Sequence, residues 1–293
     1  MATYSIRELE KLSGIKAHTI RIWEKRYKII QPKRTDTNIR YYSNNDLKKL
    51  LNITILNRQG WKISDIAKLS DEELNRKVKD FSYDSKDTES QIEKLVIAMV
   101  DLDEVKFDQI LSNAIMHDGF EQTIINLIFP FFKKIGLLWQ TGSINPAQEH
   151  FVSNLFRQKL MVAIDNLKIP DREDAKKFIL FLPENEFHEL GLLFYSYLIK
   201  KSGHSVIYLG SSVPYNDLME TCKFIKPSYL FTSITSTFDY KELAEYIEKL
   251  STSFQRQTIF MTGRKIHEED IELPANVETV SSPMEFKKRL NTL

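Results

Sequence analysis

The sequence contains almost no cysteine and no long apolar run. Cys222 is the single cysteine among 293 residues, which excludes an intrachain disulfide and a multi-cysteine zinc site. No apolar stretch approaches the roughly 18 residues that span a bilayer, and the first residues do not resemble a signal peptide. Hydrophobic residues (42%) and charged residues (28%) occur as in globular proteins, which excludes a disordered or fibrous chain. We therefore expect a cytoplasmic protein that does not bind membranes.

Positive charge is concentrated at one end of the chain. Residues 1–68 hold 15 Lys and Arg against 6 Asp and Glu, whereas the remaining residues hold 26 and 34. The first segment therefore carries a net charge of +9 and the rest −8. This asymmetry predicts a head that binds a polyanion, attached to a body that does not bind nucleic acid.

The head has the pattern of a helix-turn-helix with a wing. Ser5 can cap a helix that ends at the turn Ser13-Gly14, and a second helix follows over residues 17–26. The second helix would present His18, Thr19, Arg21, Glu24 and Lys25 outward, as in a reader of the major groove. Residues 32–43 combine turn formers with basic residues, which predicts a β-hairpin wing against the phosphate backbone. The candidate DNA-binding residues are His18, Thr19, Arg21, Lys25, Arg26, Lys33, Arg34, Arg40 and Tyr41.

This block resembles the DNA-binding domain of the MerR family of transcriptional regulators over about residues 3–70. The matching residues are Thr19-Ile-Arg-Ile-Trp-Glu-Lys-Arg-Tyr27, Pro32, Arg40-Tyr-Tyr-Ser43, Asp46-Leu47 and Gly60-Trp61. The resemblance implies a winged helix-turn-helix head that binds double-stranded operator DNA.

The middle of the chain is helical. Residues 71–90 are polar and predict a short helix and a linker. From Gln91 to about Leu167 the apolar spacing predicts four helices, the third of them kinked or restarted at Pro130. Four helices with such faces favour a small bundle.

The last part of the chain alternates strands and helices. Apolar strands are expected at about 178–182, 204–209, 229–232, 258–261 and 277–280, with helices between them that include 188–201. This alternation predicts an α/β domain with an open, parallel, doubly wound sheet of five strands. Ligands of such sheets bind beyond the carboxyl ends of the strands, so the loops that follow the strands are the candidate site.

The first of these loops contains Glu186-Phe-His188-Glu-Leu-Gly191. Glu186 can accept a hydrogen bond from one ring nitrogen of His188, which leaves the other nitrogen to ligate a metal. Gly191 allows close approach of a large group. No second ligand lies at metal-site spacing, so a bare zinc site is not expected, and a single protein ligand suits a metal already held in a macrocycle.

Glu186-x-His188-x-x-Gly191 resembles the lower-ligand motif of cobalamin-binding domains, usually Asp-x-His-x-x-Gly. In that family Ser-x-Leu follows after about 41 residues, and Gly-Gly some 26–28 residues later. Here Ser233-Ile-Thr235 follows after 41 residues, and Thr262-Gly263 after a further 26. The resemblance implies that His188 is the lower axial ligand of cobalt and that Ser233, Thr235, Thr262 and Gly263 line the site of the cofactor's nucleotide tail. Glu186, Thr235 and Thr262 depart from the family pattern.

Joined in this order, the three parts resemble the cobalamin-dependent, light-responsive repressors of the MerR family. In those proteins a Trp-x9-Glu-His motif covers the adenosyl group of adenosylcobalamin, and Trp139, Glu149 and His150 match its spacing. The residue after the tryptophan is a cobalt-capturing histidine in the photoreceptors, and here it is Gln140.

The expected organisation is a multidomain protein with an all-α winged head, a four-helix bundle and an α/β Rossmann-like sheet. The boundaries are 1–75 for the head, 76–90 for the linker, 91–170 for the bundle and 175–293 for the sheet.

The resemblance implies a repressor whose dimer or tetramer, and hence DNA binding, is set by cobalamin, with adenosylcobalamin favoured and no other metal. Two alternatives stay open. The sheet domain could have lost its cofactor and act through protein contacts, or the chain could be a cobalamin-dependent methyltransferase or mutase module. The basic head and the lack of a substrate barrel weigh against the enzyme, so no catalytic residue is expected.

Overall fold

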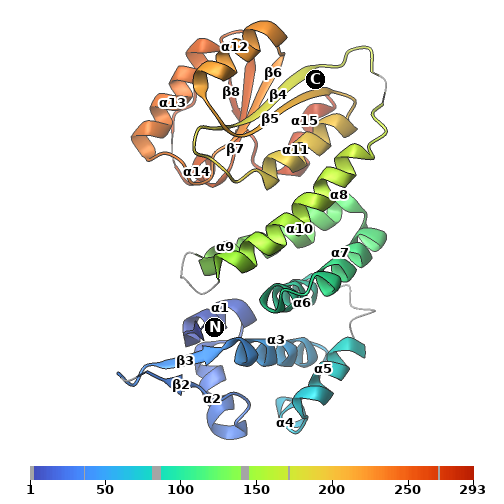
Figure 1. The fold of residues 1–293 in the computed structure, drawn as a ribbon, viewed down its shortest axis with the longest axis vertical. Helices are drawn as coiled ribbons and strands as arrows, with labels where there is room; N and C mark the ends of the chain where they lie inside the picture. The colour runs from blue at the N-terminus through green and yellow to red at the C-terminus, as the bar shows by residue number, and fades with distance from the viewer. Residues whose placement is uncertain (1–2, 36, 81–86, 140–144, 171, 270) are drawn as a thin grey trace. The chain divides into compact units, whose positions relative to one another are not determined.

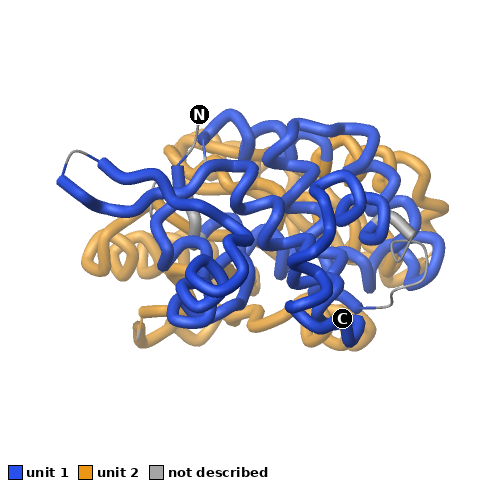
Figure 2. The backbone as a smooth tube through the Cα atoms, turned by 90° about the horizontal axis from the view of Figure 1, so that it is seen from below, with its two compact units in different colours: residues 1–155 blue, residues 156–293 orange. Residues whose placement is uncertain are grey.

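The computed structural model describes residues 3–35, 37–80, 87–139, 145–170, 172–269 and 271–293. Its contacts divide the chain into two compact units, residues 1–155 and 156–293, which Figure 2 distinguishes by colour. Each unit is described by itself. The predicted boundaries of head, linker, bundle and sheet remain predictions.

The head has the predicted helix-turn-helix and wing. Helix α1 (Ile6–Ser13) begins in a capping box in which Ser5 and Glu8 satisfy each other's backbone N–H groups. Gly14 takes the left-handed conformation after it, at φ 71°, and so turns the chain into α2 (Ala17–Tyr27). Strands β1 (Thr3–Tyr4), β3 (Arg40–Ser43) and β2 (Lys33–Arg34) form an antiparallel sheet in that order.

Helix α3 (Asn44–Arg58) is the centre of the first unit. A second capping box, between Ser43 and Asp46, starts it. This helix packs against α1, α4 (Ile63–Ile66), α5 (Asp71–Asp80) and α6 (Thr88–Asp101). Its buried residues are Leu47, Leu50, Leu51, Asn52, Ile53, Thr54, Ile55 and Leu56.

Two ion pairs tie α3 of the head to α6. Lys48 Nζ lies 2.7 Å from Asp101 Oδ1 on a partly exposed edge. Arg58 Nη2 lies 3.0 Å from Oε1 of Glu93, whose side chain is fully buried. Burial raises the pKa of Glu93 to about 7, although the positive charges of Arg58 and Lys134 oppose this rise.

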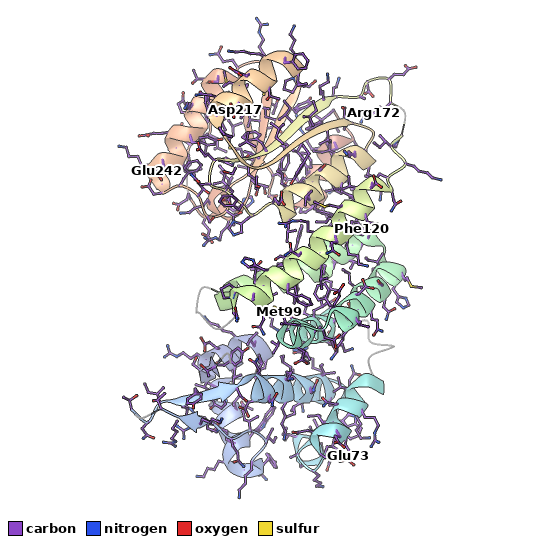
Figure 3. The ribbon with its side chains drawn as sticks, viewed as in Figure 1. Glu73, Met99, Phe120, Arg172, Asp217 and Glu242 are labelled. Atoms are coloured by element: carbon purple, nitrogen blue, oxygen red, sulfur yellow. The ribbon has the colours of Figure 1, made fainter. Side chains whose placement is uncertain are left out.

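The predicted four-helix region forms α6, α7 (Glu104–Asp118), a third helical stretch and α10 (Pro146–Asp165). Met99, labelled in Figure 3, is fully buried in it. The third stretch joins α8 (Phe120–Thr123), a π-helical turn (Ile124–Ile128) and α9 (Phe129–Trp139).

Pro130 is accommodated by this π-helical turn rather than by a break. In the turn the Phe129 N–H bonds the carbonyl of Ile124. A proline ring clashes with the carbonyl four residues earlier and has no N–H to donate, and one wider turn relieves both problems while the helix continues.

The second unit contains the predicted sheet. Its strands are parallel and lie in the order β5-β4-β6-β7-β8. Helices α12 (Tyr215–Ile225), α13 (Tyr240–Ser253) and α14 (Arg264–Glu268) cover one face, and α11 (Leu190–Lys201) and α15 (Pro283–Leu290) cover the other (Figure 1). The strands are β4 (Lys177–Pro183), β5 (Ser205–Val213), β6 (Tyr229–Ser233), β7 (Thr258–Thr262) and β8 (Val277–Thr279).

This strand order, 2-1-3-4-5 within the sheet, fixes where a ligand can bind. The order reverses between β4 and β6, and a crevice opens at the carboxyl ends of the strands at such a point. The loops after β4 and β6 therefore form the candidate site.

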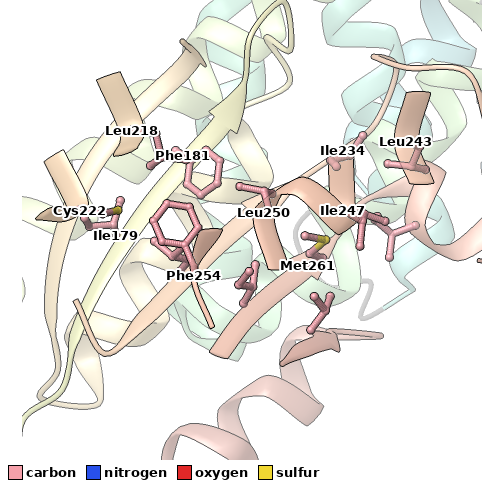
Figure 4. Close-up of a cluster of buried hydrophobic side chains, with 14 residues drawn as sticks. Ile179, Phe181, Leu218, Cys222, Ile234, Leu243, Ile247, Leu250, Phe254 and Met261 are labelled. Atoms are coloured by element: carbon pink, nitrogen blue, oxygen red, sulfur yellow. The ribbon is translucent and has the colours of Figure 1, made fainter. Parts of the chain in front are cut away.

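Both faces of the sheet are well packed. On one face Ile179 and Phe181 of β4 join a cluster with residues of α12, α13 and α14, including Leu218, Cys222 and Leu250 (Figure 4). On the other face Tyr195 of α11 and Phe286 of α15 contact Phe231 of β6, with ring centroids 4.6 and 5.0 Å from it. Cys222 is buried in this cluster, and its burial raises the pKa of the thiol to about 11.

Beside the candidate site, two element bounds differ from the sequence prediction by two residues or more. Strand β5 runs on to Val213 because two register shifts, with positive φ at Gly210 and Ser212, keep it paired with Phe181 and Pro183 at the end of β4. Helix α11 begins at Leu190 rather than at His188, which leaves His188 in the loop.

Over the described residues, no helix is both long enough and apolar enough to cross a membrane.

The raised pKa of Glu93 predicts a pH-dependent stability of the first unit. Because the folded pKa exceeds the unfolded value, the unfolding free energy is highest below about pH 4.5 and decreases as the pH rises to about 7. Glu93→Gln removes this titration. We therefore expect the unfolding free energy of the mutant, relative to that of the wild type, to rise by about 1–3 kcal/mol between about pH 5 and pH 8. Urea unfolding measures this difference.

Asp101→Asn provides the control, since it alters the partly exposed ion pair between the same two helices. Its stability should follow the wild type across this pH range. A Glu93→Gln curve parallel to the wild-type curve would contradict the prediction.

Candidate functional site

One face of α2 is exposed and basic. His18, Arg21, Lys25 and Arg26 are all exposed, and their spacing of three, four and one residues places them on one side of the helix. Ile20 is fully buried on the opposite side and anchors the helix to the head. Thr19 is half-buried at the border of the exposed face. The structure therefore brings together the α2 residues predicted to contact DNA.

The wing presents the remaining predicted DNA-binding residues. Lys33 pairs with Tyr41 and Arg34 with Arg40 across the β2–β3 ladder. Lys33, Arg34 and Arg40 are exposed, and Tyr41 is half-buried. A short basic ribbon of this kind can run along a phosphate backbone.

Glu24 does not face outward, which corrects the sequence prediction. Its side chain is only 12% exposed, accepts a hydrogen bond from the Tyr42 hydroxyl, and lies 4.0 Å from Arg40 Nε. Burial and this hydrogen bond raise the pKa of Tyr42, so the phenol stays protonated and donates. Glu24 therefore holds the recognition helix against the wing. Sequence spacing could not reveal this, because Tyr42 lies on another element.

The second part of the candidate site centres on the carboxylate of Glu186, which is fully buried after β4. Its Oε2 accepts hydrogen bonds from the backbone N–H groups of Thr235 and Ser236, both at 2.8 Å. Its Oε1 accepts from the His188 N–H at 3.2 Å and lies 2.5 Å from His188 Nδ1. One side chain thus binds the loop after β4 to the loop after β6.

These hydrogen bonds determine the charge of Glu186. Burial by itself raises the pKa of this carboxyl group, but the hydrogen bonds from His188, Ser236 and Thr235 outweigh burial and hold the pKa well below its usual range. Glu186 is therefore ionised, and an ionised acceptor at Nδ1 fixes the ring of His188. Since Nδ1 lies against the carboxylate, a metal would be ligated through Nε2 of this side chain, which is 60% exposed.

The surroundings of His188 suit a bulky group. A Cβ placed on Gly191, in the first turn of α11, would meet no atom within 4 Å. The lone imidazole also suits a metal that arrives with its other ligands, since the described residues contain no cluster of three or more His, Cys, Asp or Glu side chains able to hold a metal ion. The residues present therefore fit the lower side of a cobalt macrocycle.

The predicted tail residues meet at the ends of β6 and β7. Ser233 is paired with Thr262 in the ladder, and the Ile234 N–H donates to the Thr262 carbonyl at 2.9 Å. Gly263, at φ 107°, lies so close to this bridge that a Cβ would be 2.3 Å from the Ile234 oxygen. Glycine is therefore obligatory here. Thr235 is positioned by its backbone N–H, which donates to Glu186.

Thr262 departs from the family pattern, and the structure gives its hydroxyl a partner. Thr262 Oγ1 donates to the Val280 carbonyl at 2.9 Å, and the residue is buried. This bond connects β7 to the segment after β8. The family pattern has a glycine at this position, which has no side chain to make such a bond.

A third group at this end of the sheet was not found from the sequence. Glu189 follows His188 and lies 3.0 Å, through Oε1, from Arg157 Nε of α10. Its Oε2 accepts a hydrogen bond from Tyr208 of β5 at 3.2 Å. The last half of α10 is thereby attached to the loop that carries His188. No spacing signal indicates such a contact, because it joins three distant elements.

The predicted Trp-x9-Glu-His residues are only partly described. Glu149 Oε1 accepts from Ser153, and its Oε2 lies 3.0 Å from Nδ1 of His150, whose side chain is 73% exposed. Trp139 ends α9, but its side chain and the whole of Gln140 lie outside the described residues. The role of this motif remains a prediction.

Glu186 makes a testable contribution to the stability of the second unit. Glu186→Gln replaces one of the two acceptor oxygens by an NH2 group, which donates and cannot accept, so the N–H groups on that side lose their acceptor, and we expect a loss of about 2–3 kcal/mol in unfolding free energy. Urea denaturation measures it. Glu186→Asp keeps the charge and should lose less, and equal losses in the two variants would contradict this account.

Two family models match parts of this chain. The model of the MerR HTH family regulatory proteins matches residues 4–73, and that of the B12 binding domain matches residues 91–163. The second match covers the helical region that was predicted to form the bundle.

Two curated relatives and one solved structure extend the comparison. The HTH-type transcriptional repressor CarH of Myxococcus xanthus is 26% identical over 87% of this chain and 86% of its own length, and CarA of the same organism is 24% identical over 84% and 81%. The Methanosarcina barkeri monomethylamine corrinoid protein superimposes over 71% of this chain and all of its own, with a TM-score of 0.56 and 16% identity. That likeness concerns the fold. The chain thus joins a MerR-type helix-turn-helix domain to a B12-binding domain, and it is homologous over most of its length to these two HTH-type transcriptional repressors.

Proposed function

We propose that this protein is a transcriptional repressor that binds operator DNA through its winged head and is controlled by adenosylcobalamin held in its C-terminal half. His188 is the lower ligand of cobalt, and the bound form is a homo-oligomer that places several heads on one operator. Homology to two transcriptional repressors supports the regulatory role rather than catalysis.

The observation that carries the proposal is the Glu186–His188 pair at the switch point of the sheet. Nδ1 of His188 lies 2.5 Å from a buried, ionised carboxylate, so the ring is held before any metal binds. A structural histidine needs no such arrangement at the one edge of a parallel sheet where ligands bind. The same chain begins with a basic recognition helix, which links the two activities.

Bound adenosylcobalamin would supply a cobalt ion with an organic upper ligand. The chain's own residues would do the rest. Glu186 keeps the His188 ring in register, Gly191 leaves space over the first turn of α11, and Ser233 with Gly263 borders the tail site. Glu149 and His150 would cover the upper ligand from the first turns of α10.

The first unit contains contacts that can convey a change at α10 to the DNA head. Gln148, the residue before Glu149, is buried and donates from Nε2 to the Val100 carbonyl of α6 at 3.0 Å. On α6 the neighbouring Asp101 pairs with Lys48 of the head. Helix α6 is therefore in contact with both the proposed cover of the upper ligand and the central helix of the head. A shift of the first turn of α10 would act directly on this helix.

A second candidate function has one observation in its favour. The Thr262 side chain stands where the family has a glycine, and its hydroxyl donates to the Val280 carbonyl. A regulator that has lost its cofactor and works through protein contacts would tolerate this bond. Cofactor retention distinguishes the two candidates.

Arg21 and Arg40 test the DNA-binding surface. Both are exposed on the helix and wing that face DNA in the proposal, so Arg21→Ala and Arg40→Ala should each weaken operator binding by about 1–3 kcal/mol in a gel-shift titration. Arg256→Ala, which removes an exposed charge after α13, should leave the affinity unchanged. Wild-type affinity in both head variants would place this surface outside the interface.

His188 tests the cofactor site. The purified protein, incubated with adenosylcobalamin in the dark and desalted, should retain the cofactor with the absorption spectrum of histidine-ligated cobalt. His188→Ala should lose that spectrum. His117→Ala should keep it, because His117 is an exposed residue of α7. A spectrum unchanged in His188→Ala would refute the ligand assignment. No retention by the wild type would favour the second candidate, and a further reading after green illumination tests the response to light.

A further inference from the structure

We propose that Ile22 is a specificity-determining residue that reads the 5-methyl group of thymine in the major groove. This inference rests on the proposed function, because it assumes that α2 lies in operator DNA. It assigns a direct base contact, which neither the charges of the head nor its family resemblance provides.

Ile22 is an exposed apolar side chain in a basic surface. It is 53% exposed, and it lies on the same side of α2 as His18, Arg21, Lys25 and Arg26, at positions one to four residues away. Counted at 3.6 residues per turn, it falls inside the arc that these four residues span, opposite buried Ile20. The side chain therefore points where the flanking charges point, and not into the core of the head.

The position of Ile22 along the helix also suits base contact. Helix α2 begins at Ala17, so Ile22 is within its first two turns. The N-terminal residues of a recognition helix are those that approach base edges, while later residues approach the backbone. Arg21 beside it is able to reach guanine or phosphate, and His18 lies one turn before.

The chemistry leaves one partner for this side chain. An isoleucine neither donates nor accepts a hydrogen bond, and phosphates and most base edges in the major groove are polar. The exception is the C5-methyl of thymine, which apolar side chains contact directly. Burying one methyl group against another changes affinity by about fourfold, enough to select thymine at one position of a half-site.

Deoxyuridine supplies the test, because it lacks only the 5-methyl group. The full-length protein is first used to select bound sequences from a random duplex library, with and without adenosylcobalamin. Each enriched thymine is then replaced singly by deoxyuridine and the affinity is measured. For the wild type we expect one or two positions per half-site at which the replacement weakens binding about fourfold.

In Ile22→Ala the affinities for thymine and deoxyuridine at those positions should become equal, and Ile22→Val should keep a reduced preference. Ile169→Ala is the matched control, since Ile169 is an exposed isoleucine (54%) outside the head, and it should retain the full preference. The salt dependence of binding should be the same in Ile22→Ala as in the wild type, because no phosphate contact is lost.

If no replacement by deoxyuridine changes the affinity of the wild type, the inference is overturned, while the proposed DNA binding stands. A preference that persists in Ile22→Ala would also overturn it. If no sequence is enriched in either condition, the proposed DNA binding itself fails, and the inference fails with it.

Discussion

The geometry of the second half of the protein depends on one buried charge. The carboxylate of Glu186 accepts hydrogen bonds from two neighbouring loops and from the ring of His188, and it stays ionised because these donors outweigh the cost of burial. The two loops belong to β4 and β6, the strands between which the sheet order reverses. Without that anion, the ends of these strands would carry unpaired N–H groups and a histidine with no fixed orientation.

A comparable constraint organises the head. Glu24 accepts from Tyr42 and lies near Arg40, so an acidic residue at the back of the recognition helix connects the helix to the wing. Its basic neighbours on α2 remain on the exposed face. The two sites thus use carboxylates in the same manner, to position other groups rather than to meet the ligand.

The sequence was sufficient where chemistry follows from spacing along one element or from strand ends. The exposed residues of α2 recur with helical spacing, and Glu186 and His188 follow a strand whose carboxyl end lies at the ligand-binding edge of a parallel sheet. Ser233 and Gly263 were indicated by the family resemblance, and they lie at the ends of neighbouring strands. The sequence was insufficient where the partner lies on a distant element. Glu24 was assigned to the outer face because its partner Tyr42 lies on the wing, and neither the Arg157–Glu189 nor the Arg58–Glu93 pair leaves any periodic signal. The π-helical turn before Pro130 was also missed, because a proline predicts a disturbance but not which kind.

Helix α3 has a consequence for how such proteins diversify. Because buried residues occur on all its sides and α6 covers one of them, the head is not a self-sufficient module. A head cut away after α5 would present a bare apolar strip, together with Arg58 deprived of its buried partner. Recombination that joins such a head to a new effector must therefore bring a helix that fills the place of α6. The unit that can be exchanged intact is the head together with its first covering helix.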